Sequence, residues 1–167
     1  MAVVPVGATE QEEITRVVFS LTTIPKRVGL LKPQLDNLVE NQTRPADAVY
    51  LAVGPEITAL PAWLDLYDTT SRRPGVLRVL RMAADYGPAS KLLACLVEGG
   101  ERGRPGTLVV YGDDDIMYPA TLLAHHLSAH RAALAAGGGS VRVAFGSRRI
   151  SIGEVCRCDS IRAWTAE

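Results

Sequence analysis

The chain has 167 residues, enough for one domain with a hydrophobic core of its own. Its 18 basic residues balance 18 acidic ones, so bulk charge gives no support for binding nucleic acid or a membrane surface. No apolar run reaches the length of a membrane span, and residues 1–13 lack the regions of a signal peptide. We therefore expect a cytoplasmic protein, with the Golgi lumen as the alternative if an N-terminal anchor is missing.

Short β-type runs alternate with amphipathic helical stretches along the chain. Runs rich in Val and Leu predict strands at residues 16–21, 48–53, 76–80, 107–111 and 141–145. Apolar residues at three- and four-residue spacing predict helices at residues 31–39, 88–98 and 121–136. The connection between the second and third strands carries three prolines, and we expect one helical turn in it, around Trp63.

This alternation favours an α/β fold in which helices flank a mainly parallel sheet. The domain is expected to cover residues 15–153, between a flexible lead-in at 1–14 and a C-terminal tail at 154–167. In such sheets, ligands collect at the carboxyl ends of the strands. Candidate binding residues are therefore weighed by whether they directly follow a strand.

Three consecutive carboxylates, Asp113, Asp114 and Asp115, follow the strand predicted at residues 107–111. If the backbone stays extended, Asp113 and Asp115 point to one side and Asp114 to the other. Two carboxylates on one side would make a hard-oxygen site for Mg²⁺ or Mn²⁺, completed by substrate phosphates and water. A cation would also remove the repulsion between neighbouring carboxylates, on the order of 1 kcal/mol per pair. A solvated acidic turn is the alternative interpretation.

Two other groups of polar residues belong to predicted helices. Gly87-Pro88 opens the helix at residues 88–98, where Lys91 would offer an ammonium to a diphosphate. Asp85 would either touch a ribose or base or simply cap the helix, and an exposed Lys91 is the corresponding alternative. His126 and His130 share one face of the last helix, but no Glu completes a zinc motif there, so we expect a solvated face.

The segment Asp113-Asp114-Asp115-Ile-Met-Tyr-Pro119 resembles the DXD motif of glycosyltransferases with the GT-A fold, in the family 2-like branch. Three further segments resemble that family in the expected order. Residues 20–27 resemble the first strand and its nucleotide-contacting loop, residues 41–47 a helix-to-strand joint, and residues 85–91 the loop that covers the sugar nucleotide. The resemblance extends over about residues 15–150.

The resemblance implies a Rossmann-like GT-A domain that transfers a sugar from a nucleotide-sugar, such as a UDP- or GDP-sugar, to a hydroxyl acceptor. It implies that Asp113 and Asp115 bind Mn²⁺ or Mg²⁺, which stabilises the departing diphosphate as a Lewis acid. The residues that it assigns to donor binding are Thr22, Arg27, Asp85, Lys91 and Asp114. It assigns no catalytic residue.

Two features depart from the family pattern. The second strand ends at Val53-Gly54-Pro55, where many members carry a carboxylate that reads the base, so the identity of the base stays open. Only 52 residues follow Asp115, and they contain no recognisable acceptor motif. A truncated chain is therefore one expectation. A non-catalytic GT-A-like binding module, or a degenerate fragment without an acceptor site, is the alternative function.

Overall fold

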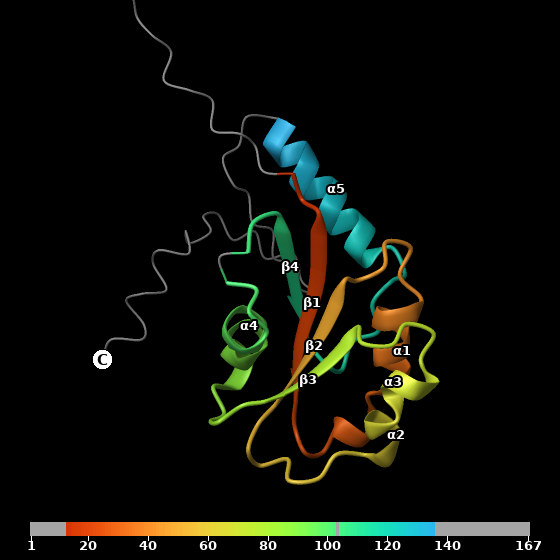
Figure 1. Ribbon diagram of the computed structural model, residues 1–167, viewed down its shortest axis with the longest axis vertical. Helices are drawn as coiled ribbons and strands as arrows, with labels where there is room; N and C mark the ends of the chain where they lie inside the picture. The colour runs from red at the N-terminus through yellow and green to blue at the C-terminus, as the bar shows by residue number, and fades with distance from the viewer. Residues whose placement is uncertain (1–12, 103, 136–167) are drawn as a thin grey trace, which may run out of the picture.

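The computed structural model describes residues 13–102 and 104–135. They form three layers, with one sheet between two layers of helices (Figure 1). The four strands are parallel and lie in the order β3-β2-β1-β4. In chain order the elements are β1 (Arg16–Thr23), the 3₁₀ turn η1 (Val28–Leu30), α1 (Lys32–Glu40), β2 (Ala48–Val53), α2 (Ala62–Asp65), α3 (Tyr67–Thr70), β3 (Leu77–Arg81), the 3₁₀ turn η2 (Gly87–Ala89), α4 (Ser90–Leu93), the π-helical turn η3 (Ala94–Glu98), β4 (Thr107–Gly112) and α5 (Leu122–Ala135). The predicted α/β class, with a parallel sheet and flanking helices, is thereby confirmed.

The element boundaries lie close to the predicted ones. The helical turn expected around Trp63 is α2, and a second short helix, α3, follows it. The strand predicted at residues 141–145, the tail at 154–167 and residues 1–12 of the lead-in lie outside the described residues. Within the part of the chain that the structure describes, no helix has both the length and the apolar character needed to cross a membrane.

The central strands β1 and β2 are buried on both faces. All six residues of β2 are buried, as expected for a parallel strand between two helical layers. Phe19 of β1 pairs with Val49 on one side and with Val110 on the other. Side chains alternate along β1, so Phe19 and Leu21 contact one helical layer and Val18 contacts the other.

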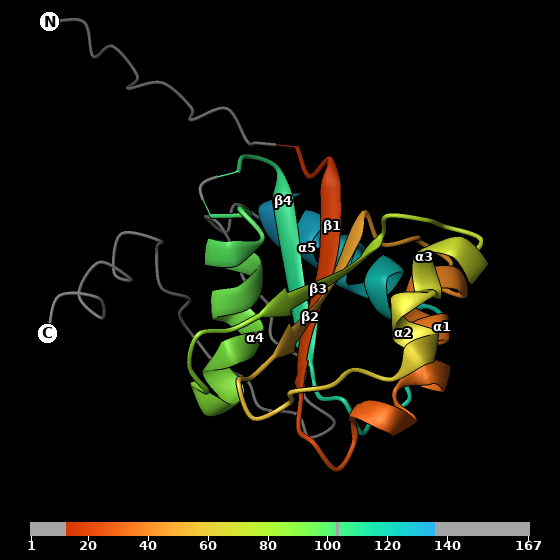
Figure 2. The same ribbon diagram turned by 60° about the horizontal axis from the view of Figure 1, so that its bottom comes forward.

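The helices cover the two faces of the sheet unequally. One face carries α1, α2, α3 and α5, and the other carries α4 with η3 (Figure 2). Leu35 of α1, Leu64 of α2 and Leu123 of α5 join one core, whereas Cys95 of η3 packs on Tyr50 in another. The chain runs outward from β1 to β2 and β3 and then returns past β1 to β4. Because crossovers are right-handed, this last one lies on the opposite face.

The segment between β3 and β4 is helical, as predicted for residues 88–98, but it is not uniform. Its last turn is widened, and the Gly99 N–H donates to the Ala94 carbonyl oxygen at 2.7 Å. Gly87 begins the segment with a φ of 57° and Gly100 follows it with a φ of 71°. Both angles are left-handed, and glycine adopts them without a steric penalty. The glycines therefore set the two ends of this segment.

The strand order reverses at β1, because β2 lies on one side of it and β4 on the other. In open α/β sheets, ligands bind beyond the carboxyl ends of the strands at such a reversal. β1 ends at Thr23 and β4 ends at Gly112, so the segments that follow these two strands begin side by side. A binding site is therefore expected between those segments.

Candidate functional site

Asp114 joins the segments that follow β1 and β4. Its side chain is only 2% exposed. The Thr23 hydroxyl donates to Asp114 Oδ2 at 2.7 Å. Arg27 Nε donates to the same oxygen at 3.0 Å, while Arg27 Nη2 lies 2.7 Å from Oδ1. Both oxygens of this carboxylate are therefore engaged within the protein, in the two-point geometry typical of strong arginine–carboxylate pairs.

The two neighbouring carboxylates are open to solvent. The side chain of Asp113 is 57% exposed and that of Asp115 is 54% exposed. Asp113 Oδ1 accepts a hydrogen bond from the Lys91 ammonium. Asp115 Oδ2 lies 3.3 Å from Nη1 of Arg27. The three carboxylates thus share two cationic partners, and the hydrogen bond to Asp114 is the main reason that the pKa of Arg27 is raised.

The backbone does not remain extended through the acidic triplet. The expectation that Asp113 and Asp115 point to one side had assumed an extended backbone. Residues 114 and 115 form a turn. Asp114 is nevertheless buried while its neighbours are exposed, because Thr23 and Arg27 hold it against the end of β1. The burial of Asp114 therefore comes from long-range contacts rather than from strand geometry.

Gln34 of α1 anchors the backbone of the loop between β4 and α5, which carries the acidic triplet. Its side-chain amide donates to the backbone carbonyl oxygens of Asp113 at 2.7 Å and Ile116 at 2.9 Å. Gln34 is 4% exposed, and its Oε1 has no hydrogen-bond partner among the described residues. A buried polar atom without a partner is uncommon in folded proteins and calls for a ligand or water. Gln34 thus fixes the loop with its amide hydrogens while its carbonyl oxygen is left without a hydrogen-bond donor among the described residues.

Two further amides extend this support along the loop. Asn37, one turn after Gln34 on α1, donates to the Tyr118 carbonyl oxygen at 2.7 Å. Gln42 donates to the Pro119 carbonyl oxygen at 3.2 Å. The amides of Gln34, Asn37 and Gln42 therefore fix the path of the chain between β4 and α5.

Tyr118 closes the loop on itself. Its hydroxyl accepts from the Asp113 N–H at 2.7 Å and donates to the Asp113 carbonyl oxygen at 3.1 Å, and its ring packs on Phe19. Burial, together with the nearby carboxylates, raises the pKa of Tyr118 to about 12. A Cβ at Gly112 would lie 2.2 Å from this hydroxyl, so the close packing requires glycine there.

A cavity of about 340 Å³ lies beside the triplet. Arg27, Asp115 and the buried Gln34 and Asp114 form its polar part. Its apolar part includes the exposed side chain of Met117, next to Leu30, Pro33 and Ile116. This combination of an apolar wall with a few convergent polar groups is typical of small-molecule sites.

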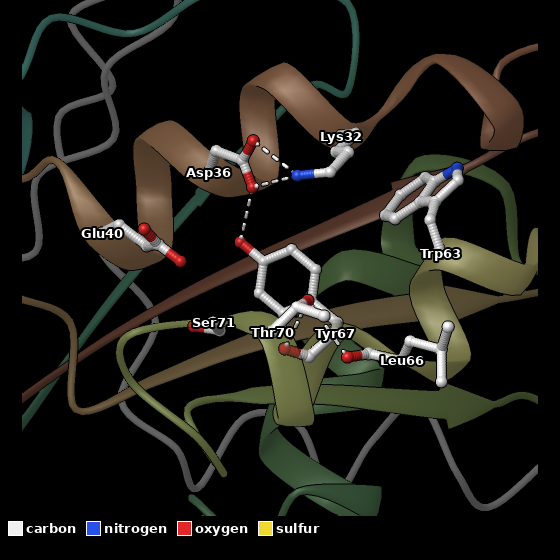
Figure 3. A pocket seen from close by; sticks show the side chains of 8 residues that line it. All are labelled: Lys32, Asp36, Glu40, Trp63, Leu66, Tyr67, Thr70 and Ser71. Carbon is white, nitrogen blue, oxygen red and sulfur yellow. Dashed lines mark hydrogen bonds and ion pairs between the residues drawn. The ribbon is translucent and has the colours of Figure 1, made fainter.

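A second cavity, of about 240 Å³, lies between α1 and the α2–α3 pair (Figure 3). Asp36 in its wall pairs with Lys32 at 2.9 Å and accepts from the Tyr67 hydroxyl at 3.1 Å. Glu40 pairs with Arg72 at 2.9 Å. Both carboxylates of this second cavity are thus partnered, and the cavity shares no lining residue with the one beside the triplet.

The structure gathers Arg27, Lys91 and the acidic triplet, and it places two other predicted donor-binding residues apart from them. The Thr22 hydroxyl donates to the Ala52 carbonyl oxygen at 3.2 Å, on the opposite face of β1 from Thr23. Asp85 is exposed and accepts from the Gly87 N–H at 2.7 Å, whereas the N-cap residue of η2 is Tyr86. Lys91 is buried, so the alternative of an exposed lysine is wrong.

The expectation of a solvated face for His126 and His130 is also wrong, because both side chains are buried. They continue the inward stripe of Leu123, three and seven residues further along α5. Burial, and to a lesser extent the neighbouring His125, lowers the pKa of His126. Within residues 13–102 and 104–135, no group of three or more His, Cys, Asp or Glu side chains is arranged to hold a metal ion.

Several residues of the site escaped the sequence analysis. Thr23 was passed over in favour of Thr22, although both end the same strand. Gln34 and Asn37 are spaced three apart beside the core residues of α1, which was the available signal for a polar contact on that helix. Tyr118 gave no signal beyond its place in the resemblance to the DXD segment.

Neither a family model nor a curated protein matches this chain. Its function therefore has to be inferred from the chemistry at the ends of β1 and β4. There, two exposed carboxylates and one buried carboxylate meet two cationic side chains beside a cavity of about 340 Å³.

Proposed function

We propose that the chain is a metal-dependent glycosyltransferase of the GT-A type, or the donor-binding domain of one. It would transfer a sugar from a nucleotide-sugar, such as a UDP- or GDP-sugar, to a hydroxyl acceptor. The observation that carries this proposal is the position of Asp113 and Asp115, exposed at the carboxyl end of β4, beside β1, where the strand order reverses. Ligands of open α/β sheets bind at this position.

The donor set fits Mn²⁺ or Mg²⁺ bound together with phosphates. Asp113 and Asp115 would each offer a hard carboxylate oxygen, whereas both oxygens of Asp114 are engaged by Thr23 and Arg27. Mg²⁺ is commonly held by one or two carboxylates, substrate phosphates and water rather than by a full protein cage. When bound, the ion would supply Lewis-acid stabilisation of the diphosphate leaving group.

The side chains around the triplet would bind and orient the donor. Arg27, fixed by Asp114, and Lys91 would contribute positive charge towards the diphosphate. The cavity beside Asp115 is large enough for part of a substrate, since ligand sites commonly measure about 300–1,000 Å³. Thr22 and Asp85 remain candidates for contacts with the base and ribose.

A non-catalytic binding module is the second candidate function. The observation that favours it is the pairing of all three carboxylates with Arg27 or Lys91, which reduces their mutual repulsion without a metal ion. Such a module would bind a nucleotide, or none, and would not transfer a sugar.

Calorimetric titration of Mn²⁺ with and without UDP or GDP tests the proposal. We expect nucleotide binding that depends on metal and that weakens about tenfold or more in Asp113→Asn/Asp115→Asn, equivalent to at least about 1.4 kcal/mol. Asp65→Asn, an exposed carboxylate on α2, is the matched control and should bind as the native chain does.

Two outcomes decide against the enzyme. Absence of metal-dependent nucleotide binding by the folded native chain would reject the donor site altogether. Metal-dependent binding without hydrolysis or transfer of any UDP- or GDP-sugar would favour the non-catalytic module. Release of the free nucleotide from the sugar donor, dependent on Mn²⁺ and on Asp113 and Asp115, would support the transferase.

A further inference from the structure

We infer that Lys91 and Arg27 exchange partners when the site is loaded: each gives up an exposed carboxylate of the triplet to the metal ion and turns to the diphosphate. This inference rests on the proposed function and goes beyond it, because it makes metal and diphosphate binding mutually dependent. It also assigns two opposite effects to Lys91, which would lower the affinity for the metal ion alone and raise the affinity for the diphosphate.

The charges of the cluster set up this exchange. Three carboxylates face one guanidinium and one ammonium, so a single negative charge remains. A divalent cation approaching alone must compete with Lys91 for Asp113 and with Arg27 for Asp115. With a diphosphate present, the displaced Lys91 and Arg27 gain a new anionic partner. The metal ion and the diphosphate then increase each other's affinity.

The three ion pairs differ in how easily they can be exchanged. The carboxylates of Asp113 and Asp115 are more than half exposed, so solvent screens their ion pairs and a metal ion can reach them, although Lys91 itself is buried. The pair between Asp114 and Arg27 is buried on the acidic side and has two contact points. We therefore expect Arg27 to keep Asp114 and to exchange only its contact with Asp115.

Lys91 is held in place independently of Asp113. The Ser20 hydroxyl of β1 donates to the Lys91 carbonyl oxygen at 2.6 Å, and the lysine side chain is buried. The backbone of Lys91 is therefore fixed, and the surrounding protein limits how far its ammonium can move from Asp113. We expect the ammonium to reach a diphosphate by a change of side-chain torsions alone.

A second observation, independent of the charges, indicates that the site is incomplete without a ligand. Gln34 lines the same cavity as Arg27 and Asp115, is almost wholly buried, and uses its amide hydrogens on the acidic loop. Its Oε1 has no partner among the described residues. A hydrogen-bond donor that arrives with the ligand, such as a hydroxyl group or a metal-bound water, would satisfy it.

The test uses the full chain with Mn²⁺ alone and then Mn²⁺ with inorganic pyrophosphate, which carries the diphosphate without a base or sugar. For Lys91→Met, we expect Mn²⁺ alone to bind about threefold more tightly at low salt, because Asp113 loses its competitor. Pyrophosphate binding in the presence of Mn²⁺ should weaken about tenfold, because the ammonium is lost. Free Mn²⁺ is followed by electron paramagnetic resonance, and pyrophosphate by calorimetry.

Lys26→Met is the matched control, since Lys26 is an exposed lysine near the end of β1. It removes the same charge without touching the triplet and should change both affinities little. Lys91→Gln, with circular dichroism to verify folding, should reproduce the opposed shifts of Lys91→Met.

The outcomes separate the inference from the function on which it rests. If the native chain binds Mn²⁺ and pyrophosphate together but Lys91→Met leaves Mn²⁺ binding unchanged or weaker, the exchange is wrong and the donor site stands. If the folded native chain binds neither probe, the proposed function fails and the exchange fails with it. Opposed shifts in both Lys91 variants, absent in Lys26→Met, support the exchange.

Discussion

The charged groups around Glu101 and those around the acidic triplet are both paired, and they differ chiefly in exposure. In the first, Glu101 has no exposed side-chain surface and accepts from Arg16 Nη2 at 2.8 Å and from the Tyr50 hydroxyl at 2.5 Å. In the second, Asp113 and Asp115 pair with Lys91 and Arg27 while remaining more than half exposed. We call Glu101 with Arg16 and Tyr50 the closed cluster, because its carboxylate is shielded from solvent. We call the acidic triplet with Lys91 and Arg27 the open cluster, because two of its carboxylates are exposed.

The comparison teaches that pairing alone does not distinguish structural charges from functional ones. Burial would by itself raise the pKa of Glu101, but the hydrogen bonds from Arg16 and Tyr50 outweigh it, and the net effect lowers the pKa below its ordinary value of 4.5. No ligand can reach this carboxylate. Within the acidic triplet only Asp114 is comparably buried. It therefore resembles Glu101 in its burial, although it lies beside the exposed Asp113 and Asp115.

The largest effect is expected in the closed cluster. Glu101→Gln should lower the free energy of unfolding at pH 7 by about 3 kcal/mol, because it leaves Arg16 without its buried counter-charge. Since the folded pKa of Glu101 is depressed, its stabilisation is present above pH 4.5 and is lost as the pH falls through the folded pKa. Urea denaturation at pH 7 and at several values below 4.5 measures both effects.

Glu98→Gln is the control for this prediction, because Glu98 is an exposed carboxylate three residues away. It should leave the free energy of unfolding nearly unchanged at every pH. A Glu101→Gln protein as stable as the native chain at pH 7 would show that the closed cluster contributes no net stability.

An intermediate effect is expected at Asp114, whose carboxylate is closed but whose partner Arg27 is 38% exposed. Asp114→Asn should cost about 1–2 kcal/mol, since a charge-assisted bond is lost and solvent screens part of it. A double-mutant cycle with Arg27→Met, measured by urea denaturation, should give a coupling free energy of about 1 kcal/mol. Strictly additive single variants would mean that Arg27 is not held by Asp114.

The smallest effect on stability is expected in the open cluster. Asp115→Asn should change the free energy of unfolding by no more than about 0.5 kcal/mol, because its ion pair with Arg27 is exposed and a like-charge repulsion is relieved. Asp113→Asn should cost slightly more, about 0.5–1 kcal/mol, because the same relief is offset by leaving the buried Lys91 ammonium without its counter-charge. Thermal denaturation of the two variants beside the native chain measures this. A loss above about 1 kcal/mol in either variant would place these carboxylates with Glu101 as structural groups.

Much of the fold could be predicted because its signals are local. The buried run at residues 48–53 predicted β2 with the observed bounds, and leucine spacing predicted α1 to within one residue at each end. Both patterns reflect the period of a single element, which neighbouring residues reveal. α2 and α3 have four residues each, too few to establish a helical period, so one helical turn was expected around Trp63 and the second, α3, was missed.

The candidate site was only partly accessible to the same reasoning. The acidic triplet was found because a run of carboxylates after a buried strand is visible in the sequence. Arg27 and Lys91 were predicted as site residues, but the contacts of Asp114 were not, because Thr23 and Arg27 lie 91 and 87 residues away from it. The histidines of α5 were misjudged because a polar residue in an inward stripe resembles one on a solvated face until its neighbours are known.

The sequence by itself determined where strands and helices form, that they alternate as in an α/β domain, and that three carboxylates follow the fourth strand. Only the tertiary structure decided the strand order, and with it the meeting of β1 and β4 at which Asp114 becomes buried while Asp113 and Asp115 stay open. The physical reason is that hydrophobic period is a property of each segment, whereas burial and ion pairing depend on which segments the crossovers bring together.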